Sequence, residues 1–134
     1  MALSLRAQNN TPVIKWHGPA VTAAVAADVE RRLDAAAEVV KNTATDAMRG
    51  PKTGAPGPIT RRSAPGEAPA GQAGDLIGSV AQGAPAALKR IVGTSLPYGK
   101  FLELGTKDIA PRPWLEVSLW ASINKIKALF RGSR

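Results

Sequence analysis

The sequence predicts a single α+β domain over residues 1–134, with a long N-terminal helix, a small antiparallel sheet that carries a long loop, and a C-terminal helix. Three observations predict this class. Apolar residues recur with helical periodicity over 19–48, prolines and glycines interrupt the pattern over 49–74, and short apolar runs precede a second helical pattern that begins at Pro113. Helices segregated from a run of short strands are typical of α+β proteins. A chain of 134 residues is long enough for one domain with one core.

The first helix follows residues 1–17, which are mixed and polar-rich and which we interpret as an N-terminal arm. We predict the helix over 19–48, because Pro19 suits a first helical turn and Gly50-Pro51 ends the pattern. At 1.5 Å per residue it is about 45 Å long, more than a domain of this size needs, so we expect it to contact a neighbouring subunit. The apolar stripe that predicts the helix consists of Val21, Val25, Val29, Leu33, Ala36, Val40, Ala44 and Met48.

Residues 49–74 contain five prolines and six glycines and therefore predict an extended loop without a helix or a central strand. A loop of this length in a compact domain is usually functional or disordered. Two interpretations stay open: a basic loop that becomes ordered against a partner, and a solvated linker. The cations that we take as candidates for docking or for the DNA channel are Arg49, Lys52, Arg61 and Arg62.

Short elements are predicted after this loop. Apolar runs over 76–81 and 87–94, with Pro85 between them, predict a loose hairpin. Residues 98–104 are predicted as a strand or a short helical turn, and Gly105 is expected to adopt a positive φ that lets the chain reverse.

The second helix is predicted from Pro113 to about residue 130, after an extended connection over 106–112 in which Pro111 and Pro113 keep the preceding residues out of the α region. Cations complement the dipole at a helix C-terminus, and Lys125, Lys127 and Arg131 occupy that end. The stripe that we expect to face the core consists of Leu115, Leu119, Ile123, Ile126 and Phe130.

Composition argues against several classes of function. The chain has no cysteine and one histidine, His17, which argues against disulfides, thiol catalysis and a histidine-rich metal site. The carboxylates over 28–38 are interspersed with arginines, so that surface ion pairs account for them. Five residues separate Gly93 from Gly99, whereas a phosphate-binding loop requires four. We therefore expect a non-enzymatic protein without catalytic, cofactor-binding or metal-binding residues.

Charge is the strongest compositional signal, because 18 lysines and arginines against 10 acids give a net charge of +8. This balance favours nucleic acid or an acidic protein as a partner, although a basic surface that serves solubility is the other interpretation. The basic loop has no aromatic residue to stack on bases, so any contact would be with phosphate and would not read sequence. No apolar run long enough for a membrane span or a signal peptide is present, and we expect a soluble, unsecreted protein.

Two stretches of the chain carry motifs in a specific order. The first is Arg-Ser-Ala-Pro-Gly-Glu-Ala-Pro-Ala over 62–70, followed by Gly-Asp-Leu-Ile-Gly-Ser-Val over 74–80. The second is Val-Gly-Thr over 92–94, then Tyr-Gly-Lys-Phe-Leu-Glu-Leu-Gly-Thr over 98–106 and Ala-Pro-Arg-Pro-Trp-Leu over 110–115. Together they resemble the small neck or tail-completion proteins of long-tailed, siphovirus-like bacteriophages, which are also called tail components.

The resemblance covers about residues 60–120 and includes four departures from the family pattern. The departures are Ala73 in place of threonine, Gly99 in place of alanine, an inserted Pro111, and Trp114 in place of phenylalanine. The resemblance implies a structural virion protein that assembles as a homo-oligomeric ring around the DNA channel and joins head to tail. Its partners would be stopper or adaptor proteins on one side and tail terminator or tail tube proteins on the other. It implies a place in the virion neck, reached from the host cytoplasm during assembly.

The matched residues supply candidates for an assembly interface: Tyr98, Glu103, Gly105, Thr106, Arg112 and Trp114. Glu103 and Arg112 are expected to pair, within the chain or across a subunit boundary. The aromatic residues and Leu102 are expected to pack the sheet against the C-terminal helix, and a role in the core alone is the other interpretation.

The alternative to a neck protein is a free, basic nucleic-acid-binding protein without sequence specificity. In that case the isolated monomer would bind duplex DNA with a steep dependence on salt. A neck subunit would bind DNA only weakly on its own. In the assembled particle its cations would lie near the phosphates of the packaged DNA.

Overall fold

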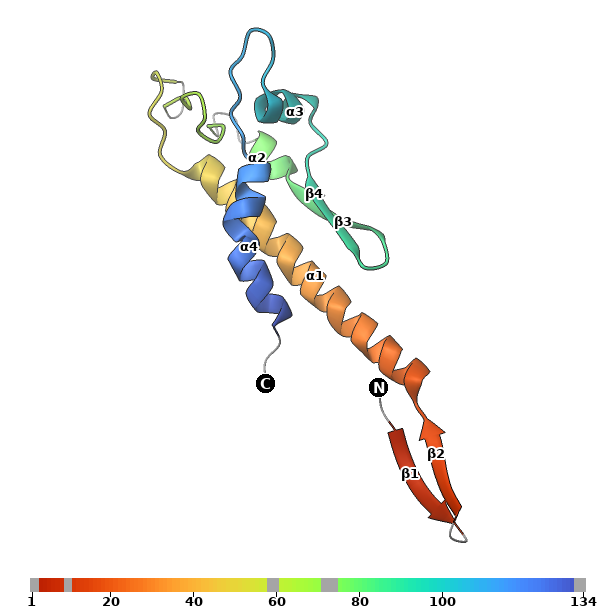
Figure 1. Cartoon of the computed structure of the whole chain (residues 1–134). Helices are drawn as coiled ribbons and strands as arrows, with labels where there is room; N and C mark the ends of the chain where they lie inside the picture. The colour runs from red at the N-terminus through yellow and green to blue at the C-terminus, as the bar shows by residue number, and fades with distance from the viewer. Residues whose placement is uncertain (1–2, 9–10, 58–60, 71–74, 132–134) are drawn as a thin grey trace.

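The computed structural model describes residues 3–8, 11–57, 61–70 and 75–131. It confirms the predicted α+β class, with a long N-terminal helix, two-stranded antiparallel pairing and a C-terminal helix (Figure 1). The elements in chain order are β1 (Leu3–Gln8), β2 (Thr11–Trp16), α1 (Gly18–Arg49), α2 (Asp75–Ser79), β3 (Ala81–Ala86), β4 (Lys89–Gly93), α3 (Pro97–Leu104) and α4 (Glu116–Phe130). Parts of the predicted arm and loop, including Ala73, lie outside the described residues.

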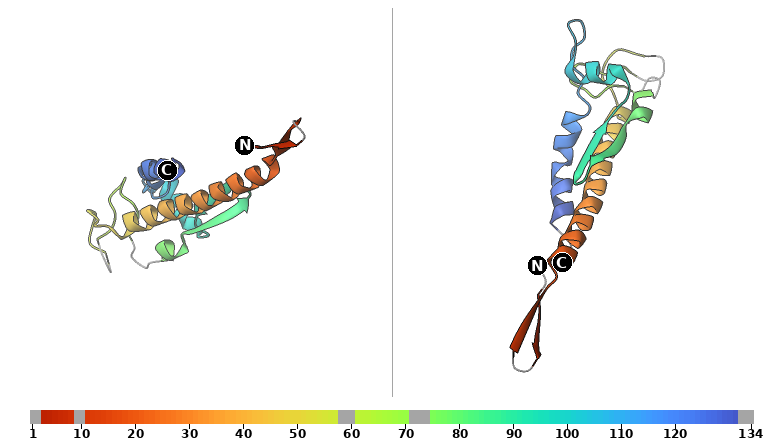
Figure 2. Two further views of the ribbon diagram at one scale, coloured as in Figure 1. Left: turned by 90° about the horizontal axis from the view of Figure 1, so that it is seen from below. Right: turned by 90° about the vertical axis from the view of Figure 1, so that its right-hand side faces the viewer.

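Helix α1 is the spine of the molecule. Helix α4 and the β3–β4 pair both pack against its C-terminal half, and α2 and α3 lie at that end (Figures 1 and 2). The β1–β2 hairpin lies beyond the opposite end of α1, away from the other elements (Figure 2). Apart from Gly18, the buried residues of α1 all lie at or after Ala36. The first turns of the spine, before the contacts made by Glu30 and Arg32, are therefore largely uncovered.

The limits of α1 follow from local chemistry. Pro19 occupies the first turn, and the Gly50 N–H donates to the Asp46 carbonyl at 3.0 Å before the chain becomes extended. Gly18 is buried under the Trp16 ring, and a Cβ at position 18 would lie 2.0 Å from that ring. The helix predicted over 19–48 is thus confirmed to within one residue at each end.

The core is small and lies where α1 meets the end of the molecule that carries α2 and α3. Its buried members are Ala44, Met48, Leu76, Val80 and Trp114. Trp114 is the only aromatic residue among them, and its indole N–H donates to the Gly99 carbonyl at 3.0 Å. This bond satisfies the one polar atom of the ring.

Several predicted elements are wrong in type or position. Residues 75–79 form a helix where a strand was predicted over 76–81, and the hairpin lies at 81–93 with Pro85 inside β3. The pairing register shifts between Gly83 and Ala86, which accommodates a proline that cannot donate a ladder bond. The chain reverses after β3 instead, where Leu88 adopts a φ of +56°.

The two ends of the chain also differ from expectation. Residues interpreted as an arm form the antiparallel hairpin β1–β2. Helix α4 begins at Glu116 and not at Pro113. The prediction of a loop is confirmed for its described parts beyond Arg49, since residues 50–57 and 61–70 contain no helix or strand.

Candidate assembly surfaces

Helix α4 packs on α1 through its smallest side chains. Ser118 and Ser122 are 3% and 1% exposed, and the Ser122 hydroxyl lies 3.0 Å from the Thr43 hydroxyl of α1. Each serine also donates to the carbonyl four residues earlier, Trp114 at 2.6 Å and Ser118 at 2.7 Å. On α1 the buried residues include Ala36, Ala37, Val40 and Ala44. Small residues on both helices leave the large side chains of α4 outside this contact.

The large apolar side chains of α4 are consequently exposed. The predicted stripe is wrong for Leu119 and Phe130, which are 43% and 42% exposed, while Leu115, Ile123 and Ile126 are half-buried. Val117 and Trp120 are also exposed, Trp120 to 63%. The cause is that Ser118 and Ser122 occupy the closest contact with α1, whereas Leu119 and Phe130 border the groove beside that contact.

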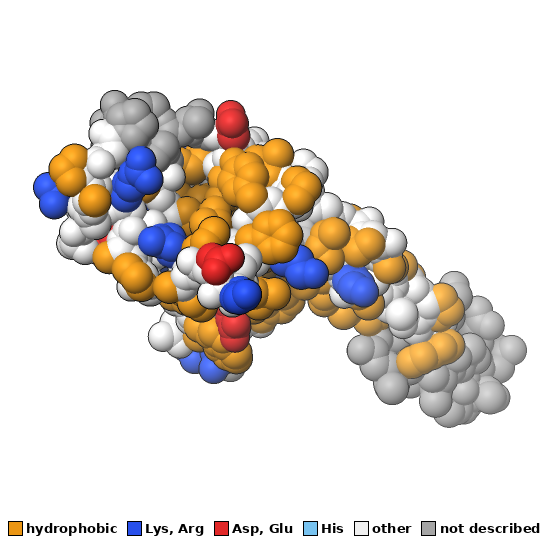
Figure 3. Space-filling view, turned by 90° about the horizontal axis from the view of Figure 1, so that it is seen from above, with side chains coloured by type: hydrophobic (Ala, Val, Ile, Leu, Met, Phe, Trp, Pro, Cys, Tyr) orange, Lys and Arg blue, Asp and Glu red, His pale blue; other side chains and the backbone are white. Residues whose placement is uncertain are grey.

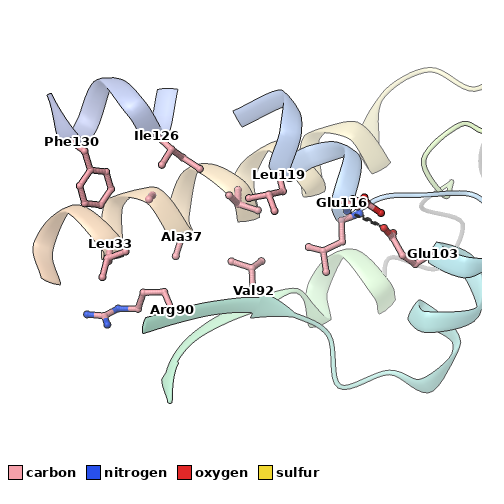
Figure 4. A pocket seen from close by; sticks show the side chains of 12 residues that line it. Leu33, Ala37, Arg90, Val92, Glu103, Glu116, Leu119, Ile126 and Phe130 are labelled. Atoms are coloured by element: carbon pink, nitrogen blue, oxygen red, sulfur yellow. Dashed lines mark hydrogen bonds between the residues drawn. The ribbon is translucent and has the colours of Figure 1, made fainter. Parts of the chain in front are cut away.

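A groove of about 490 Å³ runs between α1, α4 and β4. Figure 4 shows Leu119, Ile126 and Phe130 of α4 facing Val92 of β4 across Leu33 and Ala37 of α1. Arg90, Glu103 and Glu116 supply the polar part of its lining. The groove is an apolar surface that this chain leaves partly open.

Both ends of the α4 wall are held by charges from other elements. At the N-terminus the Glu103 carboxylate accepts the N–H groups of Trp114, Leu115 and Glu116 at 2.7 to 2.9 Å. At the C-terminus the Arg32 guanidinium donates to the Leu129 carbonyl. An anion at the N-terminus and a cation at the C-terminus both complement the helix dipole.

The expected pair between Glu103 and Arg112 does not form within the chain. Arg112 instead donates from Nε to the Ser63 carbonyl at 3.3 Å and from Nη1 to the Ala110 carbonyl at 3.2 Å. The physical reason is that the unpaired N–H groups at the start of α4 take the carboxylate.

The β4 wall of the groove is tied to α1 by Arg90. Its guanidinium pairs with Glu30 and, at 2.5 Å, with Asp34. The Leu88 N–H and the Arg90 guanidinium hold the pKa of Glu30 below its usual value, and Arg90 does the same for the pKa of Asp34. The sequence reasoning missed Arg32, Arg90 and the two serines, because their partners are distant in the chain.

A second apolar surface lies at the end of the molecule that carries α3. Figure 3 looks onto this end and shows apolar side chains gathered between scattered lysines and arginines. The exposed apolar residues of α3 and the following loop are Tyr98, Phe101, Leu104 and Ile109. The expectation that Tyr98 and Phe101 pack in the core is therefore wrong, whereas Leu102 packs against the core as expected.

The remaining assembly candidates have roles inside the chain. Gly105 has a φ of +75°, as predicted, and Trp114 is 2% exposed. The Thr106 hydroxyl accepts the Ile109 N–H at 3.1 Å and closes the loop after α3. Of the six candidates, Tyr98 is the one whose large apolar side chain lies on the surface.

The four candidate cations of the loop differ in their surroundings. Lys52 is 8% exposed, its Nζ donates to the Ala47 carbonyl at 2.7 Å, and burial lowers its pKa. The interpretation of Lys52 as a docking or DNA-facing group is wrong for this reason. In the last turn of α1, Nη1 of Arg49 lies 3.9 Å from Oδ1 of Asp46. The side chains of Arg61 and Arg62 are exposed.

The described parts of the loop are braced from within the chain. Two backbone hydrogen bonds join Arg62 to the start of the loop. The Arg62 N–H donates to the Ala55 carbonyl and the Gly54 N–H donates to the Arg62 carbonyl, each at 2.8 Å. The Glu67 carboxylate accepts the Thr53 hydroxyl at 2.5 Å and the Ala64 N–H at 2.8 Å. The loop therefore has an ordered frame without a partner.

Comparisons with known proteins identify no relative. No protein-family model, curated protein or solved structure matches the chain. In the part of the chain that the structure describes, no cluster of three or more His, Asp or Glu residues is arranged to hold a metal ion. None of the described helices combines the length and the apolar character needed to cross a membrane.

Proposed function

We propose that this chain is a structural subunit of the phage head-to-tail connection, a neck or tail-completion protein that assembles as a ring around the DNA channel. One observation carries the assembly part of the proposal: α4 buries its serines and leaves its largest apolar residues, together with the groove beside them, at the surface. A monomer gains more from burying large apolar side chains than from burying serines. Burial against other subunits gives this arrangement a physical reason.

The exposed area supports the same conclusion. The chain exposes 9238 Å², whereas a compact monomer of 13.9 kDa exposes about 6,700 Å². The excess of about 2,500 Å² exceeds what a subunit loses in two standard interfaces at about 800 Å² each. A subunit in a ring needs two such interfaces, one with each neighbour.

The place in a virion rests on the motifs over 62–115. Within the fold these motifs build the frame that presents the two apolar surfaces. Residues 98–106 form α3 and the Gly105 turn, and residues 110–115 lead into α4 and supply the buried Trp114. The resemblance thus concerns the part of the chain that positions the groove wall and the α3 surface.

The distribution of charge gives less support to the free nucleic-acid-binding alternative. Arg90 is engaged with Glu30 and Asp34, and Arg31 and Arg32 with Asp28, while Lys52 is buried. Other exposed cations are spread over several elements: Arg61 and Arg62 in the loop, Lys89 on β4, Lys100 on α3, Lys107 after α3, and Lys125, Lys127 and Arg131 near the end of α4. They suit proximity to packaged phosphate better than tight duplex binding by a monomer.

Electron microscopy of lysates in which this gene carries an early stop codon tests the proposal. We expect filled heads beside unattached tails, with intact particles restored when the gene is supplied in trans. Intact particles without the gene product would overturn the proposal. Titration of the purified protein with duplex DNA at several salt concentrations tests the alternative, which requires tight binding by the monomer with a steep salt dependence.

A further inference from the structure

The β1–β2 hairpin has one apolar and one mostly polar face. The pairing register sets Leu3 opposite Trp16, Leu5 opposite Ile14, and Ala7 opposite Pro12. Because alternate residues of a strand share a face, these six apolar positions lie on one face of the hairpin. The other face holds the positions Ser4, Arg6, Gln8, Thr11, Val13 and Lys15.

This hairpin has no core of its own to join. It lies beyond the N-terminal end of α1, and neither strand makes an extensive contact with another described element (Figures 1 and 2). An isolated two-stranded hairpin is marginally stable in water and needs another surface against its apolar face. Trp16 lies over Gly18 at the start of α1, but no described element contacts either strand extensively.

The groove between α1, α4 and β4 matches the hairpin in length and chemistry. The α4 wall has 15 residues and is about 22 Å long, and a six-residue strand is about 20 Å long. The groove lining is mainly apolar, as is one face of the hairpin. Charge agrees at one point, since the hairpin positions include Arg6 and Lys15 but no acid, while the exposed Glu116 lines the groove at the start of α4.

The hairpin cannot fill the groove of its own chain. Helix α1 is continuous from Gly18, and about 22 Å of it separates the hairpin from Leu33, the nearest residue of the groove. That distance is slightly more than the length of the hairpin, about 20 Å, so a hairpin folded back along α1 would at most reach the near end of the groove. A second copy has no such restriction.

We propose that β1–β2 is an exchange arm whose apolar face docks in the α1–α4–β4 groove of a second copy of this chain. The inference rests on the proposed function only in that copies assemble; it adds the segment and the groove that make the contact. Donor and acceptor surfaces differ, so each copy gives one arm and receives another. Contacts of this heterologous kind close into rings when the rotation between copies permits.

Cysteine cross-linking tests the contact directly, because the chain has no cysteine of its own. Full-length Ile14→Cys, on the apolar face of the hairpin, is mixed with affinity-tagged Leu119→Cys, in the groove, and oxidised mildly. We expect several-fold more disulfide-linked heterodimer than in two matched controls. The controls are Lys15→Cys with Leu119→Cys, and Ile14→Cys with Leu88→Cys, which lies on an exposed turn outside the groove. Equal yields from all three pairs would overturn the proposal.

Light scattering across a concentration series separates this inference from the proposed function. We expect Leu5→Asp to shift the assembled chain to monomer by at least tenfold in concentration, and Ser4→Asp, the same charge on the other face, to leave assembly unchanged. Assembly that persists in Leu5→Asp would overturn the arm and leave the ring intact. A wild-type chain that is monomeric at every concentration would overturn both. Circular dichroism confirms that each variant keeps its helices.

Discussion

The Glu103 carboxylate accepts the Trp114 N–H at 2.7 Å and so joins α3 to the start of α4. The same carboxylate accepts the next two N–H groups of the chain, at 2.9 Å each. One side chain, eleven residues distant from the first of its partners, thereby does what a capping residue normally does from within the helix sequence. The groove wall is fixed in place by this contact.

Replacing Glu103 tests this long-range cap. We expect Glu103→Ala to lower the free energy of unfolding by about 1–2 kcal/mol, the range for loss of a capping side chain, and Glu103→Gln to lower it by a smaller amount. Urea denaturation measures the change. Glu116→Gln is the matched control, because Glu116 lies in the same first turn but is exposed. Equal effects at the two positions would contradict the capping role.

Gly105 tests the turn after α3. Its φ of +75° and ψ of +170° lie in a region almost restricted to glycine, and a Cβ would lie 2.8 Å from the Pro111 ring. We expect Gly105→Ala to destabilise the chain by about 1–3 kcal/mol in thermal or urea denaturation. Gly78→Ala is the control, since a Cβ there meets nothing within 4 Å and α2 favours alanine. An unchanged midpoint for Gly105→Ala would show that the turn adapts.

We expect low pH to weaken the hydrogen bonds by which Glu67 holds the loop and so to lower the free energy of unfolding. Hydrogen bonds from the Thr53 hydroxyl and from the Ala64 and Thr53 N–H groups hold the pKa of Glu67 below its usual value of 4.5. A carboxyl whose pKa is lower in the folded state stabilises that state fully above the usual value and loses the effect as pH falls through the lowered one. We therefore expect Glu67→Gln to lose less stability than the wild type between pH 6 and pH 3, measured by urea denaturation.

The other carboxyls with lowered pKa values keep part of this acid sensitivity in the variant. They are Asp28, Glu30 and Asp34. Asp108→Asn removes an exposed carboxyl in the loop after α3 and serves as a control for the loss of charge alone. Identical pH profiles for Glu67→Gln and the wild type would contradict the role of Glu67.

The buried face of α4 consists of small residues, so we expect enlarging a buried serine to cost more stability than removing an exposed tryptophan. We expect Ser122→Leu, an enlargement at a position that is 1% exposed, to destabilise the chain by about 1–3 kcal/mol through overpacking against α1. Trp120→Ser, at a position that is 63% exposed, should change the free energy of unfolding by only about 0.5 kcal/mol. Urea denaturation at low protein concentration measures both. A Trp120→Ser chain as unstable as Ser122→Leu would place Trp120 in the core.

Local signals explain which elements the sequence could predict. Helix α1 was predictable because Pro19 and Gly50 mark its ends and an apolar stripe runs between them. Gly105 was predictable because a chain reversal requires glycine there. Residues 76–81 were not, because a short apolar run fits a helix as well as a strand. In the N-terminal hairpin, the alternation from Leu3 to Arg6 was a period-two signal that the polar composition of the arm obscured.

The buried face of α4 was not predictable for a different reason. The helix has large apolar residues on more than one side, and periodicity alone selects the largest set as the core face. In the structure Ser118 and Ser122 take that place, because close approach to the alanines of α1 favours small side chains. Some apolar residues of the helix thus pack within the chain and others are exposed, and the sequence pattern does not distinguish the two groups.

The length of α1 has a geometric consequence. With 32 residues it is about 48 Å long, and the uncovered start of its N-terminal half acts as a rigid spacer between the hairpin and the elements packed on α1. Deleting four residues from that half would shorten the spacer by about 6 Å and rotate the hairpin by about 40° about the helix axis. In an assembly held together by the hairpin, the number of residues in this part of α1 would therefore determine the distance and the rotation between neighbouring copies.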